Sequence, residues 1–167
     1  MPTTERKVSS VAGSTPAAQE RDEFAKRTYR DTPVDVKIVL AALWTAMLFV
    51  FAYVDIFASL RGDVLRAALD GKVASLNVEV NQAVLAATLI YILVPSLMIV
   101  LSLLLKPRAS RIANITISVV YIVTIAASCI GETWAYYLIG SAVEVLLLAM
   151  IARTAWKWPR QSAAAST

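Results

Sequence analysis

The sequence contains no histidine and only one cysteine, Cys129. Histidine-based catalysis, histidine metal sites and haem ligation by histidine are therefore excluded. A lone cysteine forms neither an intrachain disulfide nor a cysteine metal cluster, and the C-x-x-C pair of thiol chemistry is missing. These absences predict no cofactor. They also favour a non-enzymatic role, because paired thiols, histidines and a recognisable nucleophile motif are all lacking.

Charge is nearly absent from four long apolar segments, residues 34–57, 82–105, 112–130 and 135–155. They make the 167-residue chain 58% hydrophobic, above the roughly 45–50% of a soluble domain. About 20 apolar residues in a helix cross the hydrocarbon core of a bilayer. We therefore predict an all-α integral membrane protein, an up-down four-helix bundle in contact with the lipid bilayer.

The remaining segments are polar and define the predicted domain boundaries. Residues 1–33 are expected to form a disordered cytoplasmic tail, residues 34–160 the transmembrane domain, and residues 161–167 a second disordered tail. Between the first two spans, residues 63–70 carry periodic apolar side chains and lie between Gly62 and Gly71. This pattern predicts a short amphipathic helix on the outer surface.

Lysine and arginine are distributed unequally between the two sides of the predicted bundle. Of the 16 in the chain, 13 flank the spans on the side that carries both termini, and only Arg61, Arg66 and Lys72 lie on the other. Because basic flanks stay in the cytoplasm, we predict a multi-pass protein of the inner (plasma) membrane with both termini cytoplasmic. This placement explains the net charge of +4 without nucleic-acid binding. The sequence leaves open whether the protein is a homo-oligomer.

The fourth predicted span carries one carboxylate, Glu144, near its middle, where a charge costs roughly 2.5–3.5 kcal/mol or more. We hypothesise that Glu144 meets the hydroxyls of Tyr91 and Tyr121 inside the bundle and stays protonated there. Ser118 and Ser141 share the same polar helix faces and complete this candidate ligand-binding set. The alternative is a structural acid that fixes how the helices pack.

The third span has a stripe of polar residues at helical spacing, which predicts one inward-facing side. The stripe consists of Asn114, Ser118, Tyr121, Thr124, Ser128 and Glu132. In the second span, Pro95 removes one backbone hydrogen bond, so the carbonyl group of Tyr91 needs another partner.

Two further acids, Asp55 and Glu132, lie near the outer ends of the first and third spans. We predict that they sit at the mouth of the bundle, where they share a cation such as Arg61 or Arg66. A two-carboxylate metal or acid–base site is conceivable at this mouth. The favoured interpretation is that both are interfacial residues in contact with water.

These observations leave two functions open. The first is binding of a small hydrophobic or lipid-like molecule, or of a partner helix, in the polar-lined interior. The alternative is a proton-coupled exporter of small molecules with Glu144 as the exchanging acid.

Single residues distributed along residues 34–159 carry a family resemblance. They are Tyr53-Val54-Asp55, Pro95, Arg111, Asn114-Ile115, Trp134-Ala135-Tyr136-Tyr137, Glu144 and Trp158-Pro159. With this set the chain resembles a bacterial family of small four-helix membrane proteins of unknown function, and its architecture is loosely similar to that of the DoxX type. The resemblance implies the four-helix fold and a plasma-membrane location, but no substrate, cofactor or catalytic role.

Overall fold

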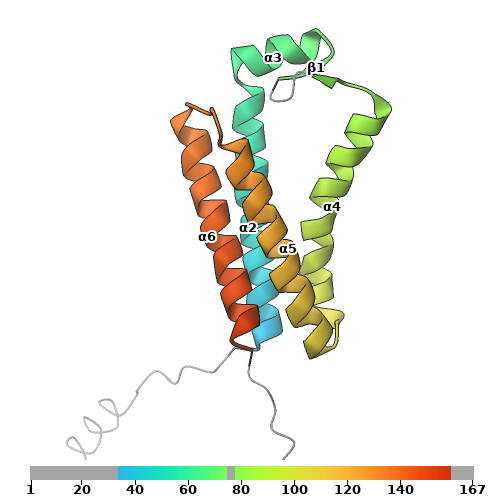
Figure 1. Cartoon of the computed structure of the whole chain (residues 1–167), viewed down its shortest axis with the longest axis vertical. Coiled ribbons are helices and arrows are strands. Elements are labelled where there is room, and N and C mark those ends of the chain that lie inside the picture. Colours follow the sequence, from blue (N-terminus) through green and yellow to red (C-terminus); the bar gives the residue numbers. More distant parts are fainter. Residues whose placement is uncertain (1–33, 75–77, 159–167) are drawn as a thin grey trace, which may run out of the picture. The chain divides into compact units, whose positions relative to one another are not determined.

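Four long helices, one short helix and a small hairpin make up the part of the chain that the structure, a computed structural model, describes: residues 34–74 and 78–158 (Figure 1). In chain order they are α2 (Val36–Ser59), α3 (Gly62–Leu69), β1 (Lys72–Val73), β2 (Val78–Glu79), α4 (Gln82–Leu104), α5 (Pro107–Ser128) and α6 (Ala135–Trp156). The tails predicted at 1–33 and 161–167 lie outside the described residues.

All four long helices suit a bilayer. The shortest have 22 residues, which at 1.5 Å per residue span roughly 33 Å, and each is apolar enough to cross a membrane. Their outward faces expose large apolar side chains such as Phe49, Val123 and Leu146, as lipid-facing surfaces do. The predicted all-α, four-helix membrane architecture is confirmed, and the chain is a multi-pass membrane protein.

The helices pack in the order α5, α6, α2, α4, because α6 packs against both α5 and α2 while α4 packs mainly against α2. We call the end with α3 and the β1–β2 hairpin the α3 end, and the opposite end, where α4 turns into α5, the turn end (Figure 1). Contacts between α4 and α5 are the least extensive of the four neighbouring pairs, although the turn joining them is short. This side of the bundle is therefore the most weakly closed.

Two local details differ from the sequence-based expectation. Helix α5 begins at Pro107 rather than at residue 112, because proline suits the first helical turn, where no amide donor is needed. The segment after α3, for which no element was predicted, contains an antiparallel hairpin that pairs Lys72 with Glu79. It begins after Gly71, whose φ of 70° favours glycine. The predicted short helix over 63–70 is confirmed as α3.

Lys37, at the start of α2, joins that helix to the end of α4. Asp35 caps α2 by accepting a hydrogen bond from the backbone amide of Lys37, at 2.7 Å. The Lys37 ammonium group donates to the carbonyl oxygens of Leu103 and Leu105, both at 2.9 Å. A helix end leaves its last carbonyls without partners and carries partial negative charge. Lys37 therefore stabilises the end of α4 and holds it against α2.

The buried apolar core lies mostly toward the turn end. It consists of Leu40, Trp44, Met47, Met98, Tyr121, Ile125, Leu148, Ile151 and Ala155. The buried residues of α4 are Pro95, Met98 and Ser102, all in its second half. Residues 82–94 of α4 contribute none, and Figure 1 shows this half leaning away from α5. Helix α4 thus covers the bundle interior closely at the turn end and loosely at the α3 end.

Candidate functional site

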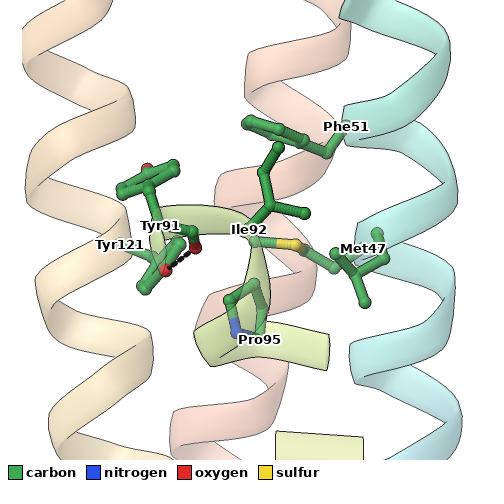
Figure 2. A pocket seen from close by; sticks show the side chains of 7 residues that line it. Met47, Phe51, Tyr91, Ile92, Pro95 and Tyr121 are labelled. Carbon is green, nitrogen blue, oxygen red and sulfur yellow. Dashed lines mark hydrogen bonds between the residues drawn. The ribbon is translucent and has the colours of Figure 1, made fainter. Parts of the chain in front are cut away.

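Tyr91 and Tyr121 meet at the proline of α4 (Figure 2). Their rings stack with centroids 4.7 Å apart, and the Tyr121 hydroxyl donates to the Tyr91 backbone carbonyl. That carbonyl lies four residues before Pro95, so it has no helical amide donor. The predicted need for another partner is confirmed, and α5 supplies it.

Because of this contact, we expect Pro95→Ala to reduce the loss of stability that Tyr121→Phe causes. Tyr121→Phe leaves the Tyr91 carbonyl without a donor and should lower the free energy of unfolding by about 1 kcal/mol. Pro95→Ala restores the amide donor, so in that background Tyr121→Phe should cost measurably less. Denaturant unfolding in detergent, followed by tryptophan fluorescence, measures both effects. Equal costs in the two backgrounds would contradict the assigned hydrogen bond.

The crevice beside this pair is lined by side chains of α2, α4 and α5, among them Met47, Phe51 and Pro95 (Figure 2). It is too narrow to hold a water molecule. The Tyr91 hydroxyl points away from it and pairs with the hydroxyl of Thr124, at 2.8 Å. A molecule larger than water therefore enters here only if α4 moves away from α5.

Glu144 is buried in the interior, with 2% of its surface exposed. One of its carboxyl oxygens, Oε1, is fully buried and accepts no hydrogen bond from any described residue. The predicted contact with the two tyrosine hydroxyls is wrong, because those hydroxyls bond to Thr124 and to the Tyr91 carbonyl instead.

Close packing of α6 against α2 explains how Glu144 comes to be buried. Gly140 lies one turn before Glu144, and a Cβ atom at Gly140 would overlap the side chain of Val54. The missing side chain of Gly140 lets α6 pack closely on α2 at this point. Asp55 follows Val54 in α2, so it lies near the turn of α6 that precedes Glu144. The structure thus associates Asp55 with Glu144, which sequence reasoning did not do.

The other predicted site residues lie in different surroundings. Ser141 is buried next to Gly140. Ser118 is buried and donates to carbonyls of its own helix, those of Asn114 and Ile115. Of the predicted polar stripe, Asn114, Ser118 and Tyr121 face inward, whereas Thr124 and Ser128 are exposed. Ser128 accepts a hydrogen bond from the Tyr137 hydroxyl, at 2.9 Å.

A second cluster of polar side chains, toward the turn end, was not predicted from the sequence. The Asn114 carboxamide oxygen accepts from the Trp44 indole N–H at 2.7 Å and from the Ser102 hydroxyl at 3.1 Å. Its amide group donates to the Ser110 carbonyl, at 2.8 Å. Three helices, α2, α4 and α5, therefore meet at one buried side chain. The inward position of Asn114 was predictable from spacing, but its partners on the other helices were not.

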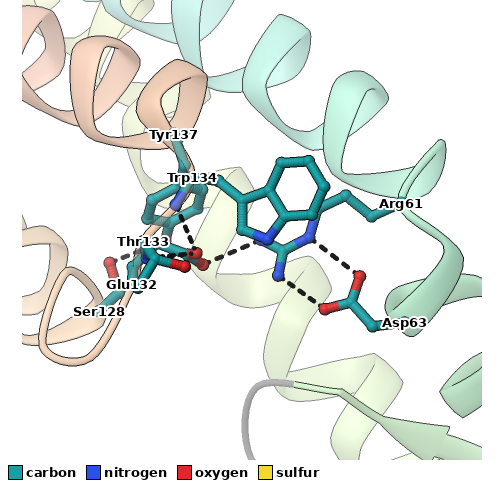
Figure 3. A network of polar contacts seen from close by, with 7 residues as sticks. All are labelled: Arg61, Asp63, Ser128, Glu132, Thr133, Trp134 and Tyr137. Carbon is teal, nitrogen blue, oxygen red and sulfur yellow. Dashed lines mark hydrogen bonds and ion pairs between the residues drawn. The ribbon is translucent and has the colours of Figure 1, made fainter.

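At the α3 end, the prediction that Asp55 and Glu132 share a cation is confirmed for Glu132 and wrong for Asp55. Arg61 pairs with Glu132 at 2.9 Å and with Asp63 at 2.7 Å (Figure 3), and its guanidinium group lies 4.8 Å from the centre of the Trp134 ring. Asp55 is not a partner of Arg61, because it lies within α2 beside Val54. Across residues 34–74 and 78–158, no three acidic or cysteine side chains gather closely enough to hold a metal ion.

These ion pairs make stability at the α3 end dependent on pH. The hydrogen bond from Arg61 lowers the pKa of both Glu132 and Asp63, and those bonds raise the pKa of Arg61. Carboxylates with a lowered pKa stabilise the fold fully above their ordinary values, about 4.3 for Glu and 3.9 for Asp. That contribution is lost as the pH falls through the lowered values.

We therefore expect the melting temperature in detergent to fall more steeply below about pH 4 for the wild type than for Arg61→Gln. Arg66→Gln is the matched control, because Arg66 makes no ion pair with any described residue. Parallel pH profiles for wild type and Arg61→Gln would show that these pairs do not support the fold.

The structure so far defines a class: a four-helix, multi-pass membrane protein with a buried acid and hydroxyl pairs between its helices. Residues 32–165 match the model of a family of unknown function, DUF6326. The chain belongs to this family, which agrees with the resemblance to a family without an assigned role. No curated protein matches the chain, and no solved structure matches it.

Proposed function

We propose that the protein binds an amphipathic, lipid-like molecule in the half of the bundle toward the α3 end, with the polar group of that molecule at Glu144. The observation that carries the proposal is the buried carboxyl oxygen of Glu144, which has no donor among the described residues. At membrane depth an unsatisfied polar group costs several kcal/mol. A ligand that donates a hydrogen bond or a positive charge removes that cost.

The route of entry follows from how α4 packs. No side chain of residues 82–94 of α4 is fully buried, and across this half the hydroxyl pair Tyr91–Thr124 connects α4 to α5. Pro95 directly follows this segment and removes one backbone hydrogen bond from α4. We propose that the first half of α4 moves about Pro95, so that a lipid-like molecule enters sideways from the bilayer between α4 and α5.

Photolabelling in lipid vesicles tests this function. The probe is a long-chain alcohol with a diazirine in its tail, and the read-out is the labelling of α4 and α5 relative to the lipid-facing region around Leu146. We expect Glu144→Leu to reduce the ratio about tenfold, since it removes a hydrogen bond to a charged or buried group. Glu79→Leu, which alters an exposed acid outside the spans, should leave it unchanged. Equal labelling of wild type and Glu144→Leu, or crosslinking to a second protein chain instead, would overturn the proposal.

A second candidate, proton-coupled export, is favoured by one observation: the buried acid Glu144 lies one turn from the Gly140–Val54 contact, and a second acid, Asp55, follows Val54. Two acids that lie close together do not readily both ionise, so one of them tends to keep its proton. Export predicts that adding substrate to purified protein releases protons, and that Glu144→Gln stops efflux without unfolding the protein. Binding without proton release would favour the first function.

The proposed membrane orientation rests on the distribution of basic residues. Lys106, Arg108 and Arg111 lie at the turn end together with Lys37 and Arg153. We propose that this end faces the cytoplasm of a bacterial cell with both chain termini, and that the α3 end faces outward. Labelling of single cysteines at positions 66 and 108 with a membrane-impermeant reagent in intact cells tests it, with Cys129 replaced. Modification of position 108 but not of position 66 would show that the orientation is the opposite of the one proposed.

A further inference from the structure

The charges around Glu144 are all of one kind. Along the spans, residues 38–60, 82–105, 112–128 and 135–152 contain two acids, Asp55 and Glu144, and no lysine or arginine. Asp55 follows Val54, which packs on α6 at Gly140, one turn before Glu144. Both ion pairs among the described residues use Arg61, which Asp63 and Glu132 already hold. The spans therefore offer the buried carboxyl group of Glu144 and the exposed one of Asp55, with no cation of the described span residues 38–60, 82–105, 112–128 and 135–152 to pair with either.

Three aromatic side chains line the crevice between α2, α4 and α5. Phe51 and Tyr91 approach with ring centroids 6.2 Å apart, and Tyr91 stacks on Tyr121. These rings line the crevice that would have to open for a ligand (Figure 2). Aromatic faces attract cations, by about 2 kcal/mol or more when water is excluded. An anionic head group would meet both acids and the negative faces of the rings.

From this geometry we infer that the bound molecule carries a positively charged head group, an alkylammonium or similar organic cation with an apolar tail. The inference rests on the proposed function and names the ligand class for the same site. The cation lies between the Glu144 carboxyl group and the aromatic rings, with Asp55 as the second acid. Its apolar tail remains between α4 and α5 in contact with lipid.

Three photoreactive amphiphiles with the same diazirine tail test the inference. Their head groups are trimethylammonium, hydroxyl and carboxylate, and their partitioning into protein-free vesicles is measured so that the membrane concentrations are matched. The trimethylammonium probe should reach half-maximal labelling of α4 and α5 at about a tenfold lower membrane concentration than the hydroxyl probe. The carboxylate probe should label weakest.

Two substitutions at one position separate charge from hydrogen bonding. Glu144→Gln removes the charge and keeps an acceptor oxygen, so it should abolish the advantage of the trimethylammonium head while hydroxyl labelling persists. Glu144→Leu removes both and should weaken every probe. Asp55→Asn should weaken only the trimethylammonium probe, and Glu79→Gln is the matched control outside the spans.

The outcomes decide between the inference and the function beneath it. If the hydroxyl probe equals or exceeds the trimethylammonium probe and still depends on Glu144, the cation is wrong and the binding function stands. If no probe depends on Glu144, both fall. Circular dichroism and the melting temperature of each variant show that a loss of labelling does not come from unfolding.

Discussion

Gly140→Ala is expected to destabilise the protein even though alanine is the better helix former. In a helix interior, alanine is favoured over glycine by about 1 kcal/mol. In α6, however, the added Cβ atom would overlap the Val54 side chain on α2. Valine has one strongly preferred side-chain rotamer in a helix, so the helices must separate. Overpacking of this kind costs about 1–3 kcal/mol, and the net effect should be a loss of stability.

The compensating change is Val54→Ala, which removes the methyl group that meets the new Cβ atom. The double variant should recover most of the free energy of unfolding lost by Gly140→Ala, measured by denaturant titration in a mild detergent. Gly62→Ala is the matched control, because a Cβ atom at Gly62 meets nothing within 4 Å. If Gly140→Ala proves as harmless as Gly62→Ala, α2 and α6 do not approach as closely as described. Because Glu144 lies one turn away, the same variant should also weaken probe labelling.

Asn114→Leu is expected to have the other large effect. Leucine has a similar volume but leaves the Trp44 indole N–H and the Ser102 hydroxyl without the acceptor they share. Each buried unsatisfied group costs about 1–3 kcal/mol, moderated within membranes, where hydrogen bonds between helices average about 0.6 kcal/mol. We expect a loss of about 2 kcal/mol in the free energy of unfolding.

A double-mutant cycle with Trp44→Phe tests whether this loss belongs to the contact between α2 and α5. Once the indole N–H is gone, Asn114→Leu should cost less than in the wild type. Ser118→Ala is the control, because the Ser118 hydroxyl bonds only to carbonyls of its own helix and should cost little. Additive effects of Trp44→Phe and Asn114→Leu would mean that the two side chains do not cooperate.

The sequence by itself determined the features that depend only on residues close together along the chain. The length and apolarity of the runs define the four spans, because crossing a bilayer requires about 20 apolar residues whatever the helix packs against. Residues 63–70 were recognisable as a short helix, and Pro95 as the cause of an unpartnered Tyr91 carbonyl. Each of these follows from backbone chemistry within one segment.

The tertiary structure decided which side chains from different helices meet. Spacing placed Asn114 and Glu144 on inward faces, but it did not reveal that Asn114 joins three helices while Glu144 Oε1 has no donor among the described residues. It also did not reveal that Arg61 forms an ion pair with Asp63 rather than with Asp55. Such pairings depend on the rotation, tilt and depth of each helix, which follow from packing such as that of Gly140 on Val54. A one-dimensional pattern contains the period of a helix but not its position relative to its neighbours.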